Sequence, residues 1–296
     1  MRHALALLFV LLAIPAHGRE RGAARDAEPT FRDDLDRSVH IPQPPQRIVS
    51  LLPSITETVC ALDACTRLVA TDQFSNWPAA VRNLPKVGGL EDAQIEAIVR
   101  LRPDLVLLSR TQRITDRLAQ LGVPSFALSS ETYASIAHDV RVLGDLLGDP
   151  ARAVRLEQQI ASGIETIGAR SRADRQGNAP SVYFEVDRIP YAAGPTSFIG
   201  ELLTRLGARN IVTADLGPFP KLNPEYVVRS DPDLIIVAAA DAPHLLERPG
   251  WADLRAVREH RICALSRDVR DTVVRPGPRV TEGMQALADC LSQWAP

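Results

Sequence analysis

The sequence reads EAIVRLRPDLVLL at residues 96–108 and EYVVRSDPDLIIV at residues 225–237. In both stretches a glutamate stands seven residues before a proline, an arginine lies between them, and Pro-Asp-Leu then opens an apolar run. The only two lysines of the chain, Lys86 and Lys221, each follow a proline in the loop before one copy. The repeat indicates two related halves, each with a glutamate at the same place.

Length and composition allow two domains. The chain has 296 residues, and a hydrophobic content of 45% suffices to build two ordinary cores. The formal net charge of −2 gives no reason to expect nucleic acid or an anionic membrane surface as a partner.

The first eighteen residues have the pattern of an export signal. A short basic region precedes an apolar run, and Ala16-His17-Gly18 supplies small residues for cleavage. The run is too short to span a bilayer, and no cysteine follows it to carry a lipid anchor. We therefore predict a signal peptide over residues 1–18, a flexible polar leader over 19–45, and a soluble mature protein in the periplasm.

Four cysteines in an exported chain allow two disulfides in three connectivities. Proximity in the sequence favours Cys60 with Cys65 and Cys263 with Cys290. The first bridge requires a helix to end between its two cysteines, because residues five apart on one helix point in different directions. Free, buried thiols are the alternative for Cys60 and Cys65.

Strands alternate with helices on both sides of a helical middle. We expect an N-terminal lobe over 46–149, a connecting helix over 150–172 and a C-terminal lobe over 173–296. The predicted fold class is α/β, with two similar three-layer lobes, mainly parallel sheets and one long interdomain helix. Ser54 and Glu57 have the spacing of a capping box at the first helix of the N-terminal lobe.

No catalytic signature is present. The chain lacks a Gly-x-Ser-x-Gly elbow, a phosphate-binding loop and a His-Glu-x-x-His motif. No two of the later histidines have metal-ligand spacing, so we predict no protein-held metal and no catalytic residues. These histidines are His40, His138, His244 and His260. An exported α/β enzyme acting on a similar ligand remains the alternative from another class.

Aromatic and charged residues follow the predicted strands. Open α/β sheets bind ligands beyond the carboxyl ends of their strands, so these residues are candidates for a cleft between the lobes. Of Tyr183 and Phe184, which are neighbours on one strand, only one is expected to face outward. The candidates are Phe74, Trp77, Phe184, Tyr191, Phe219, Asp271 and Arg275.

The chain resembles the periplasmic substrate-binding proteins of ABC importers, and within them the cobalamin-binding family, whose two lobes are joined by a single rigid helix. The resemblance runs from about residue 47 to 295. It rests on Pro53-Ser-Ile-Thr-Glu57, Phe74-Ser-Asn-Trp77-Pro, Tyr191-Ala-Ala-Gly, Phe219-Pro, both copies of the repeat and the loop from Arg275 to Arg279. It implies ligand-contacting roles at Pro53, Phe74, Phe184, Tyr191, Phe219, Asp271 and Arg275.

The resemblance also implies a role for the repeated glutamates. In this family one surface glutamate on each lobe meets an arginine pocket of the permease, and these positions match Glu96 and Glu225. Glu91 is the nearest competitor on the first lobe. The alternative is that both glutamates only favour helix N-termini through the macrodipole.

One departure concerns the ligand. Where cobalamin binders of this type place a tryptophan, this chain has Gly88-Gly89, which removes a stacking surface. Haem would call for Tyr191 as a ligand, and a ferric siderophore for arginines such as Arg275 and Arg188. We predict that a monomeric, non-enzymatic protein without a resident cofactor captures a corrinoid, cobalamin in particular, and delivers it to ABC permease subunits.

Overall fold

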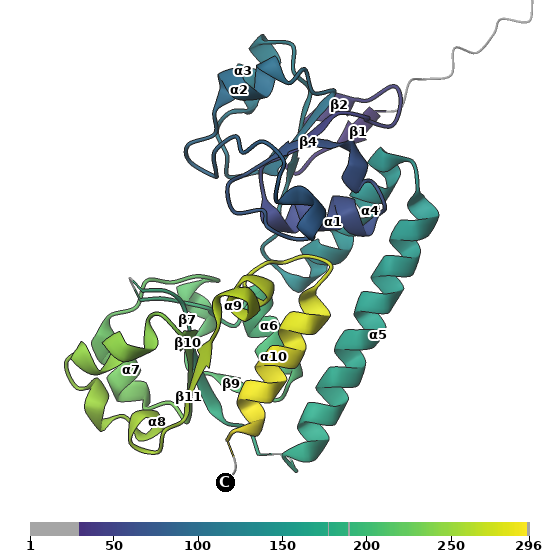
Figure 1. The fold of residues 1–296 in the computed structure, drawn as a ribbon. Coiled ribbons are helices and arrows are strands. Elements are labelled where there is room, and N and C mark those ends of the chain that lie inside the picture. Colours follow the sequence, from purple (N-terminus) through teal and green to yellow (C-terminus); the bar gives the residue numbers. More distant parts are fainter. Residues whose placement is uncertain (1–29, 177, 189, 295–296) are drawn as a thin grey trace, which may run out of the picture.

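The computed structural model describes residues 30–294 except residues 177 and 189, and the predicted signal peptide lies outside this part. Two lobes are stacked end to end, and one long helix, α5 (Pro150–Asp174), runs along the side of both (Figure 1). The expected fold class, two α/β lobes with mainly parallel sheets joined by a long helix, is confirmed. Among the described residues, no helix has the length and apolar character needed to cross a membrane.

The N-terminal lobe contains four parallel strands in the order β4-β3-β5-β6. Almost every strand residue is buried, as expected for a parallel sheet covered by helices on both faces. The strands are β3 (Ile48–Ser50), β4 (Leu68–Thr71), β5 (Leu105–Ser109) and β6 (Ser125–Leu128). The helices are α1 (Pro53–Ala61), α2 (Ile95–Arg100), α3 (Thr115–Gln120) and α4 (Tyr133–Leu147).

The C-terminal lobe repeats this arrangement. Its parallel strands have the order β9-β7-β10-β11, and β8 adds an antiparallel strand to β7. The strands are β7 (Ser181–Asp187), β8 (Tyr191–Ala192), β9 (Arg209–Asn210), β10 (Leu234–Ala238) and β11 (Ile262–Leu265). The helices are α6 (Phe198–Arg205), α7 (Pro224–Ser230), α8 (Arg255–Arg258), α9 (Arg267–Val273) and α10 (Val280–Ser292). Short 3₁₀ turns occupy Cys65–Arg67, Ala79–Val81, Ala214–Leu216, Ala242–Glu247 and Trp251–Asp253.

The aspartate of the repeated Pro-Asp-Leu has the same role in both lobes. The Asp104 carboxylate accepts hydrogen bonds from the backbone N–H groups of Gln46 and Arg47, at 2.7 and 2.9 Å, just before β3. The Asp233 carboxylate accepts from the backbone N–H and the hydroxyl of Ser181, at 2.8 and 2.7 Å, where β7 begins. Each aspartate therefore attaches the start of its own strand to the start of the neighbouring parallel strand.

Helix α5 packs closely on both lobes. At about 1.5 Å per residue, its 25 residues span roughly 37 Å. A Cβ atom added to Gly144 of α4 would lie 2.3 Å from the Cβ of Ala153 on α5. A Cβ atom added to Gly163 of α5 would lie 2.6 Å from a methyl group of Thr281 on α10. These close contacts on either side favour a rigid connection between the lobes.

Residues 30–45 differ from the flexible leader predicted for them. They include a hairpin of β1 (Thr30–Arg32) and β2 (Ser38–His40), and Ile41 after it is buried. The backbone N–H of Asp34 donates to the Ala127 carbonyl at 3.0 Å, and the buried Asp33 carboxylate accepts from the Ala127 N–H at 3.2 Å. These bonds attach the hairpin to β6, a long-range pairing that the polar, proline-containing sequence does not indicate.

Both disulfides predicted from proximity are present, Cys60–Cys65 and Cys263–Cys290. Helix α1 ends at Ala61, between the first two cysteines, as that bridge requires. The second bridge joins β11 to α10 within the C-terminal lobe.

Candidate functional site

A buried ion cluster joins the two lobes. Glu57 on α1 of the N-terminal lobe is 3% exposed. Its carboxylate accepts from Nη1 of Arg275 at 2.9 Å and from Nε and Nη2 of Arg279, both at 3.0 Å. Both arginines belong to the C-terminal lobe, in the segment that ends α9 and begins α10. A carboxylate with this little exposure needs such partners because an unpaired buried charge is strongly unfavourable.

The capping box predicted for Ser54 and Glu57 is wrong. Helix α1 has Leu52 as its N-cap and Pro53 in its first turn, and no side chain caps it. Within the described part of the chain, the Ser54 hydroxyl has no hydrogen-bond partner. Because the helix begins two residues earlier than expected, Glu57 does not take part in a cap and is free to face the other lobe.

The loop after β4 carries two exposed aromatic side chains, Phe74 and Trp77. The buried Asp72 carboxylate accepts from the backbone N–H groups of Phe74 and Ser75, at 2.7 and 3.1 Å, which holds the loop in a tight turn. The Lys86 ammonium donates to the Ser75 carbonyl at 2.7 Å. Burial raises the pKa of Asp72 and lowers that of Lys86. The loop thus has a fixed polar base beneath its exposed aromatic residues.

Three of the aromatic residues predicted at the ligand are exposed. The exposed fractions are 57% for Phe74, 42% for Trp77 and 40% for Tyr191. The guanidinium of Arg279 lies 4.9 Å from the centroid of the Trp77 ring, a cation–π contact between the lobes. Large exposed aromatic side chains are available to stack on a flat ligand, and these come from both lobes.

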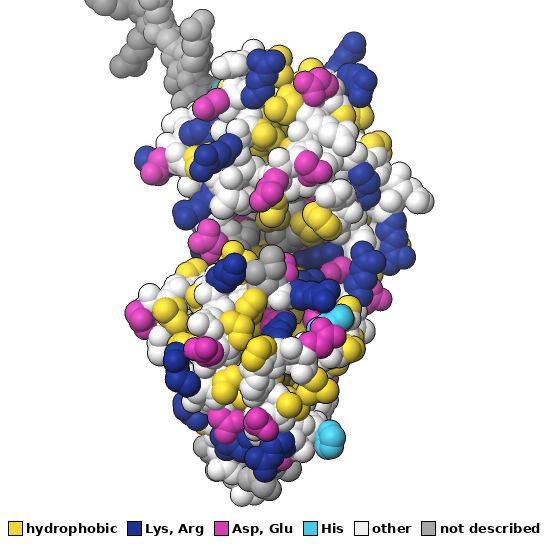
Figure 2. Space-filling model, turned by 90° about the vertical axis from the view of Figure 1, so that its left-hand side faces the viewer, with side chains coloured by type: hydrophobic (Ala, Val, Ile, Leu, Met, Phe, Trp, Pro, Cys, Tyr) yellow, Lys and Arg dark blue, Asp and Glu magenta, His cyan; other side chains and the backbone are white. Residues whose placement is uncertain are grey.

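The structure brings Trp77 and Asp271 together at a hollow of about 250 Å³ between the lobes. It is lined by Asn76, Trp77, Arg82, Asp268, Asp271 and Arg279. Figure 2 shows the face onto which the cleft opens, with hydrophobic side chains on both rims and basic side chains at one end of the waist. The hollow is smaller than the roughly 300–1,000 Å³ of ordinary small-molecule pockets, so a large ligand would extend along the open cleft.

Asp271 and Arg275 are occupied by protein partners. Nη2 of Arg275 donates to the Asp271 carboxylate at 2.9 Å and to the Phe74 carbonyl at 3.0 Å. The Asn76 amide donates to Asp271 at 3.2 Å and its oxygen accepts from Arg275 at 2.8 Å. Arg275, which is buried, therefore orders the aromatic loop from the opposite lobe. The sequence predicted a site role for Asp271 and Arg275, but it did not predict one for Glu57, Asn76 or Arg279.

The expectation that either Tyr183 or Phe184 faces outward is wrong. Both are buried, with Phe184 1% exposed, because helices cover both faces of the β7 sheet. Phe184 packs in the main core, and the Tyr183 hydroxyl donates to Glu185 at 2.8 Å. Phe184 therefore has a packing role and presents no surface to a ligand.

The other predicted ligand positions are half-buried. Pro53 begins α1, and Phe219 packs against the core with its ring 6.5 Å from that of Phe198. Gly88 has φ +94°, and an added Cβ atom there would lie 2.3 Å from the Asp92 carbonyl oxygen. A side chain at this position would strain the loop, which accounts for the glycine at residue 88.

Glu96 and Glu225 occupy equivalent places. They lie in the first turns of α2 and α7, and both are exposed. Within the described part of the chain neither forms an ion pair. In Figure 1, α2 and α7 lie on the side of their lobes away from α5. Glu91, the competing position, is also exposed.

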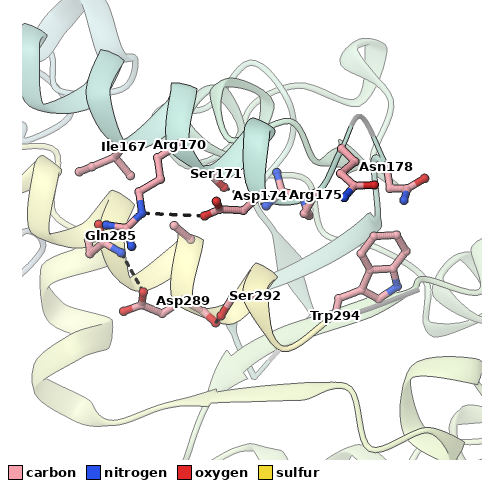
Figure 3. A pocket seen from close by; sticks show the side chains of 12 residues that line it. Ile167, Arg170, Ser171, Asp174, Arg175, Asn178, Gln285, Asp289, Ser292 and Trp294 are labelled. Atoms are coloured by element: carbon pink, nitrogen blue, oxygen red, sulfur yellow. Dashed lines mark hydrogen bonds and ion pairs between the residues drawn. The ribbon is translucent and has the colours of Figure 1, made fainter.

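A separate hollow of about 470 Å³ lies between the end of α5 and α10, in the part of the C-terminal lobe remote from the cleft (Figure 3). Its polar side chains largely bond to each other: Arg170 approaches Asp174 at 3.9 Å, and Gln285 donates to Asp289 at 2.8 Å. None of the predicted ligand-binding residues lines it.

Two α/β lobes joined by one long helix, with an exposed tryptophan at a hollow between the lobes, are the arrangement expected of a two-lobed solute-binding protein. Residues 48–269 match the family described as "Periplasmic binding protein", and the chain belongs to this family of solute-binding proteins.

Two relatives cover most of the chain. An uncharacterised ABC transporter substrate-binding lipoprotein of Bacillus subtilis is 28% identical over 303 residues, covering 97% of this chain and 95% of the relative. A cobalamin-binding protein of Halobacterium salinarum is 28% identical over 289 residues, covering 94% of this chain and 78% of the relative.

Two solved structures share the fold. The periplasmic haem-binding protein of Roseiflexus is 27% identical, with a TM-score of 0.74 over 84% of this chain and 98% of that one. The vitamin B12-binding protein of Vibrio cholerae is 22% identical, with a TM-score of 0.72 over 84% of this chain and 98% of that one. The second likeness shows the fold alone.

Proposed function

We propose that this protein captures a corrinoid, cobalamin in particular, in the interlobe cleft and delivers it to an ABC import permease. The observation that carries the proposal is the set of exposed aromatic side chains on the two lobes, Phe74 and Trp77 on one lobe and Tyr191 on the other. A corrin ring is large and flat, and aromatic side chains stack on such a surface. The cobalamin-binding relative supports this choice of ligand.

Pro53, Phe219 and Asp271 complete the proposed ligand surface. Arg275 lies beneath this surface and supports it. Arg275 positions the aromatic loop through its bond to the Phe74 carbonyl. A rigid α5 favours small closing movements over wide opening. The cargo would be held without chemical change, so the proposed protein is a periplasmic, non-enzymatic carrier without a resident cofactor, monomeric when free.

We assign permease docking to Glu96 and Glu225. Two exposed charges on separate lobes of a rigid body fix orientation and accelerate encounter with a complementary surface. Their equivalent exposure and lack of ion pairs among the described residues support this role over a contribution to the helix ends alone.

Haem is the second candidate. Tyr191 is 40% exposed and offers a phenolic oxygen as a ligand for ferric iron, and a haem-binding structural neighbour is 27% identical. A ferric siderophore is less well supported, because Glu57 and Asp271 already pair with Arg275 and leave Arg188 as the remaining predicted arginine.

Titration of the purified protein with cyanocobalamin, haem and a ferric siderophore tests the proposal. Tryptophan fluorescence provides the signal, and a Trp77→Phe variant assigns it, because Trp251 is fully buried and Trp294 lines the separate hollow between α5 and α10. We expect cyanocobalamin to bind at micromolar concentration or below and to be recovered chemically unchanged. Binding of haem without binding of cyanocobalamin would make haem the assigned ligand. Chemical turnover of the bound ligand would favour an enzyme.

A further inference from the structure

A cluster of metal-ligating side chains lies outside the interlobe cleft. Asp34 follows β1 in the N-terminal hairpin, and His138 and Asp139 are neighbours on α4. One ligand atom from each residue lies within 4.8 Å of those of the other two. The sequence did not indicate this cluster, because Asp34 is 104 residues away from His138.

Hydrogen bonds fix the cluster. Oδ2 of Asp34 accepts from the Ser129 N–H at 2.6 Å, and Oδ1 lies 3.1 Å from Nε2 of His138. The Ser130 hydroxyl donates to Oδ2 of Asp139. Such outer bonds orient carboxylates in the manner of the second shell around a bound metal.

Asp139 carries the observation that points to a ligand. It is 4% exposed, and its Oδ1 has no hydrogen-bond partner among the residues that the structure describes. A buried carboxylate oxygen without a partner is costly, and a bound cation is one of the few groups able to satisfy it.

An open hollow reaches the cluster from solvent. Asp34 and His138 line it together with Asp33, Asp36 and Ser129. Its two arginines are paired with acidic groups, Arg32 with Asp36 at 3.0 Å and Arg110 with Glu131 at 3.5 Å. A hydrated cation can therefore enter, and both nearby positive charges are already balanced.

We propose that Asp34, His138 and Asp139 form a binding site for a divalent transition-metal ion of the Zn²⁺ type. One imidazole and two carboxylates are a donor set that suits such ions. Oδ1 of Asp34 and Nε2 of His138 lie 3.1 Å apart. Two ligand atoms of a tetrahedral ion with bonds of about 2.1 Å lie roughly 3.4 Å apart, which is close to this distance. The ion would tie the N-terminal hairpin to α4 and keep a water ligand on the side of the hollow. This site is independent of the corrinoid cleft, and it departs from the sequence-based expectation of no metal.

Calorimetric titration of EDTA-stripped, untagged protein with Zn²⁺ tests the proposal, together with the unfolding midpoint. We expect one strong site, and a midpoint at least about 3 °C higher when Zn²⁺ is in large excess over the dissociation constant. His138→Ala should weaken binding at least about tenfold and abolish the shift, and Asp139→Asn should do the same.

His244→Ala is the matched control, because His244 also pairs with a carboxylate, that of Glu247 at 3.0 Å, but away from the cluster. This variant should bind Zn²⁺ like the wild type. Absence of binding to the wild type, or equal binding by His138→Ala, would overturn the proposal. The His138 side chain is 44% exposed, so its truncation leaves the fold intact and the test valid even where Asp139→Asn does not fold.

Discussion

Glu57 and Arg275 form a 2.9 Å ion pair across the lobe boundary, with side chains that are 2% and 9% exposed. The pair lies directly behind the aromatic loop, since Arg275 also binds the Phe74 carbonyl. Contact between the lobes and the shape of the proposed ligand surface therefore depend on the same arginine.

The first prediction concerns this pair. Glu57→Gln removes the charge that Arg275 and Arg279 share, and we expect the free energy of unfolding to fall by about 3 kcal/mol, as for other broken buried pairs. Urea unfolding measures the change. Asp174→Asn is the control, because its pair with Arg170 is exposed and should contribute less than about 0.5 kcal/mol. Equal stabilities of the two variants would contradict this account of the cluster.

The second prediction concerns stacking in the cleft. Trp77→Ala should weaken cyanocobalamin binding about tenfold or more, because truncating an aromatic residue at the centre of an interface commonly costs over 1 kcal/mol. The Trp77→Ala variant lacks the fluorescence signal of Trp77, so calorimetry measures its affinity for cyanocobalamin. Leu121→Ala is a matched control, with the same 42% exposure at the end of α3. Loss of affinity in both variants would indicate a general structural effect.

The third prediction concerns docking. The double variant Glu96→Ala, Glu225→Ala should keep its ligand affinity but stimulate the ATPase of the cognate transporter about tenfold less, since charge complementarity governs encounter. Glu91→Ala should behave like the wild type. Unchanged stimulation of the ATPase by the double variant would show that both glutamates only stabilise the N-termini of their helices.

The fourth prediction concerns pH. Burial alone would raise the pKa of Asp233, but hydrogen bonds from Ser181 and the charge of Arg255 hold it below 3.8. Because the folded pKa is depressed, the ionised carboxylate stabilises the fold above the unfolded pKa of 3.8, and this contribution is lost as pH falls through the folded value.

Asp233→Asn tests this sign. At pH 7 the variant should be less stable by about 1.5 kcal/mol, the usual range for hydrogen bonds to a charged group. Denaturant unfolding between pH 3 and 7 should show the difference from wild type shrinking below about pH 4, where the Asp233 carboxylate of the unfolded wild-type chain begins to take up a proton. A difference that stays constant down to pH 3 would contradict the role given to Asp233.

Local patterns were enough to predict most of the architecture. The two Pro-Asp-Leu copies predicted equivalent strands, because in each lobe the aspartate bonds attach the strand that follows it to the neighbouring parallel strand. The helical spacing of apolar residues in the middle of the chain predicted α4 and α5. The hairpin at 30–40 was missed, since its partner strand, β6, lies far along the chain.

The site was only partly predictable for a similar reason. Phe74, Trp77 and Tyr191 were predicted because they are aromatic residues that follow strands, and all three side chains are exposed; their contact with a ligand stays a prediction. Glu57 was interpreted as a helix cap, since its two arginines lie more than 200 residues away. A glutamate on an apolar helix face, together with arginines four residues apart, was the available signal.

We propose that the interlobe cleft holds the corrinoid. A crystal structure of the protein with cyanocobalamin, with the cobalt located by its anomalous scattering, tests it most directly. The account predicts one cobalt peak between the lobes, with the corrin ring against Trp77 on one side and Tyr191 on the other. A cobalt peak outside the cleft, or a cleft without a corrin in crystals grown at saturating ligand, would contradict it.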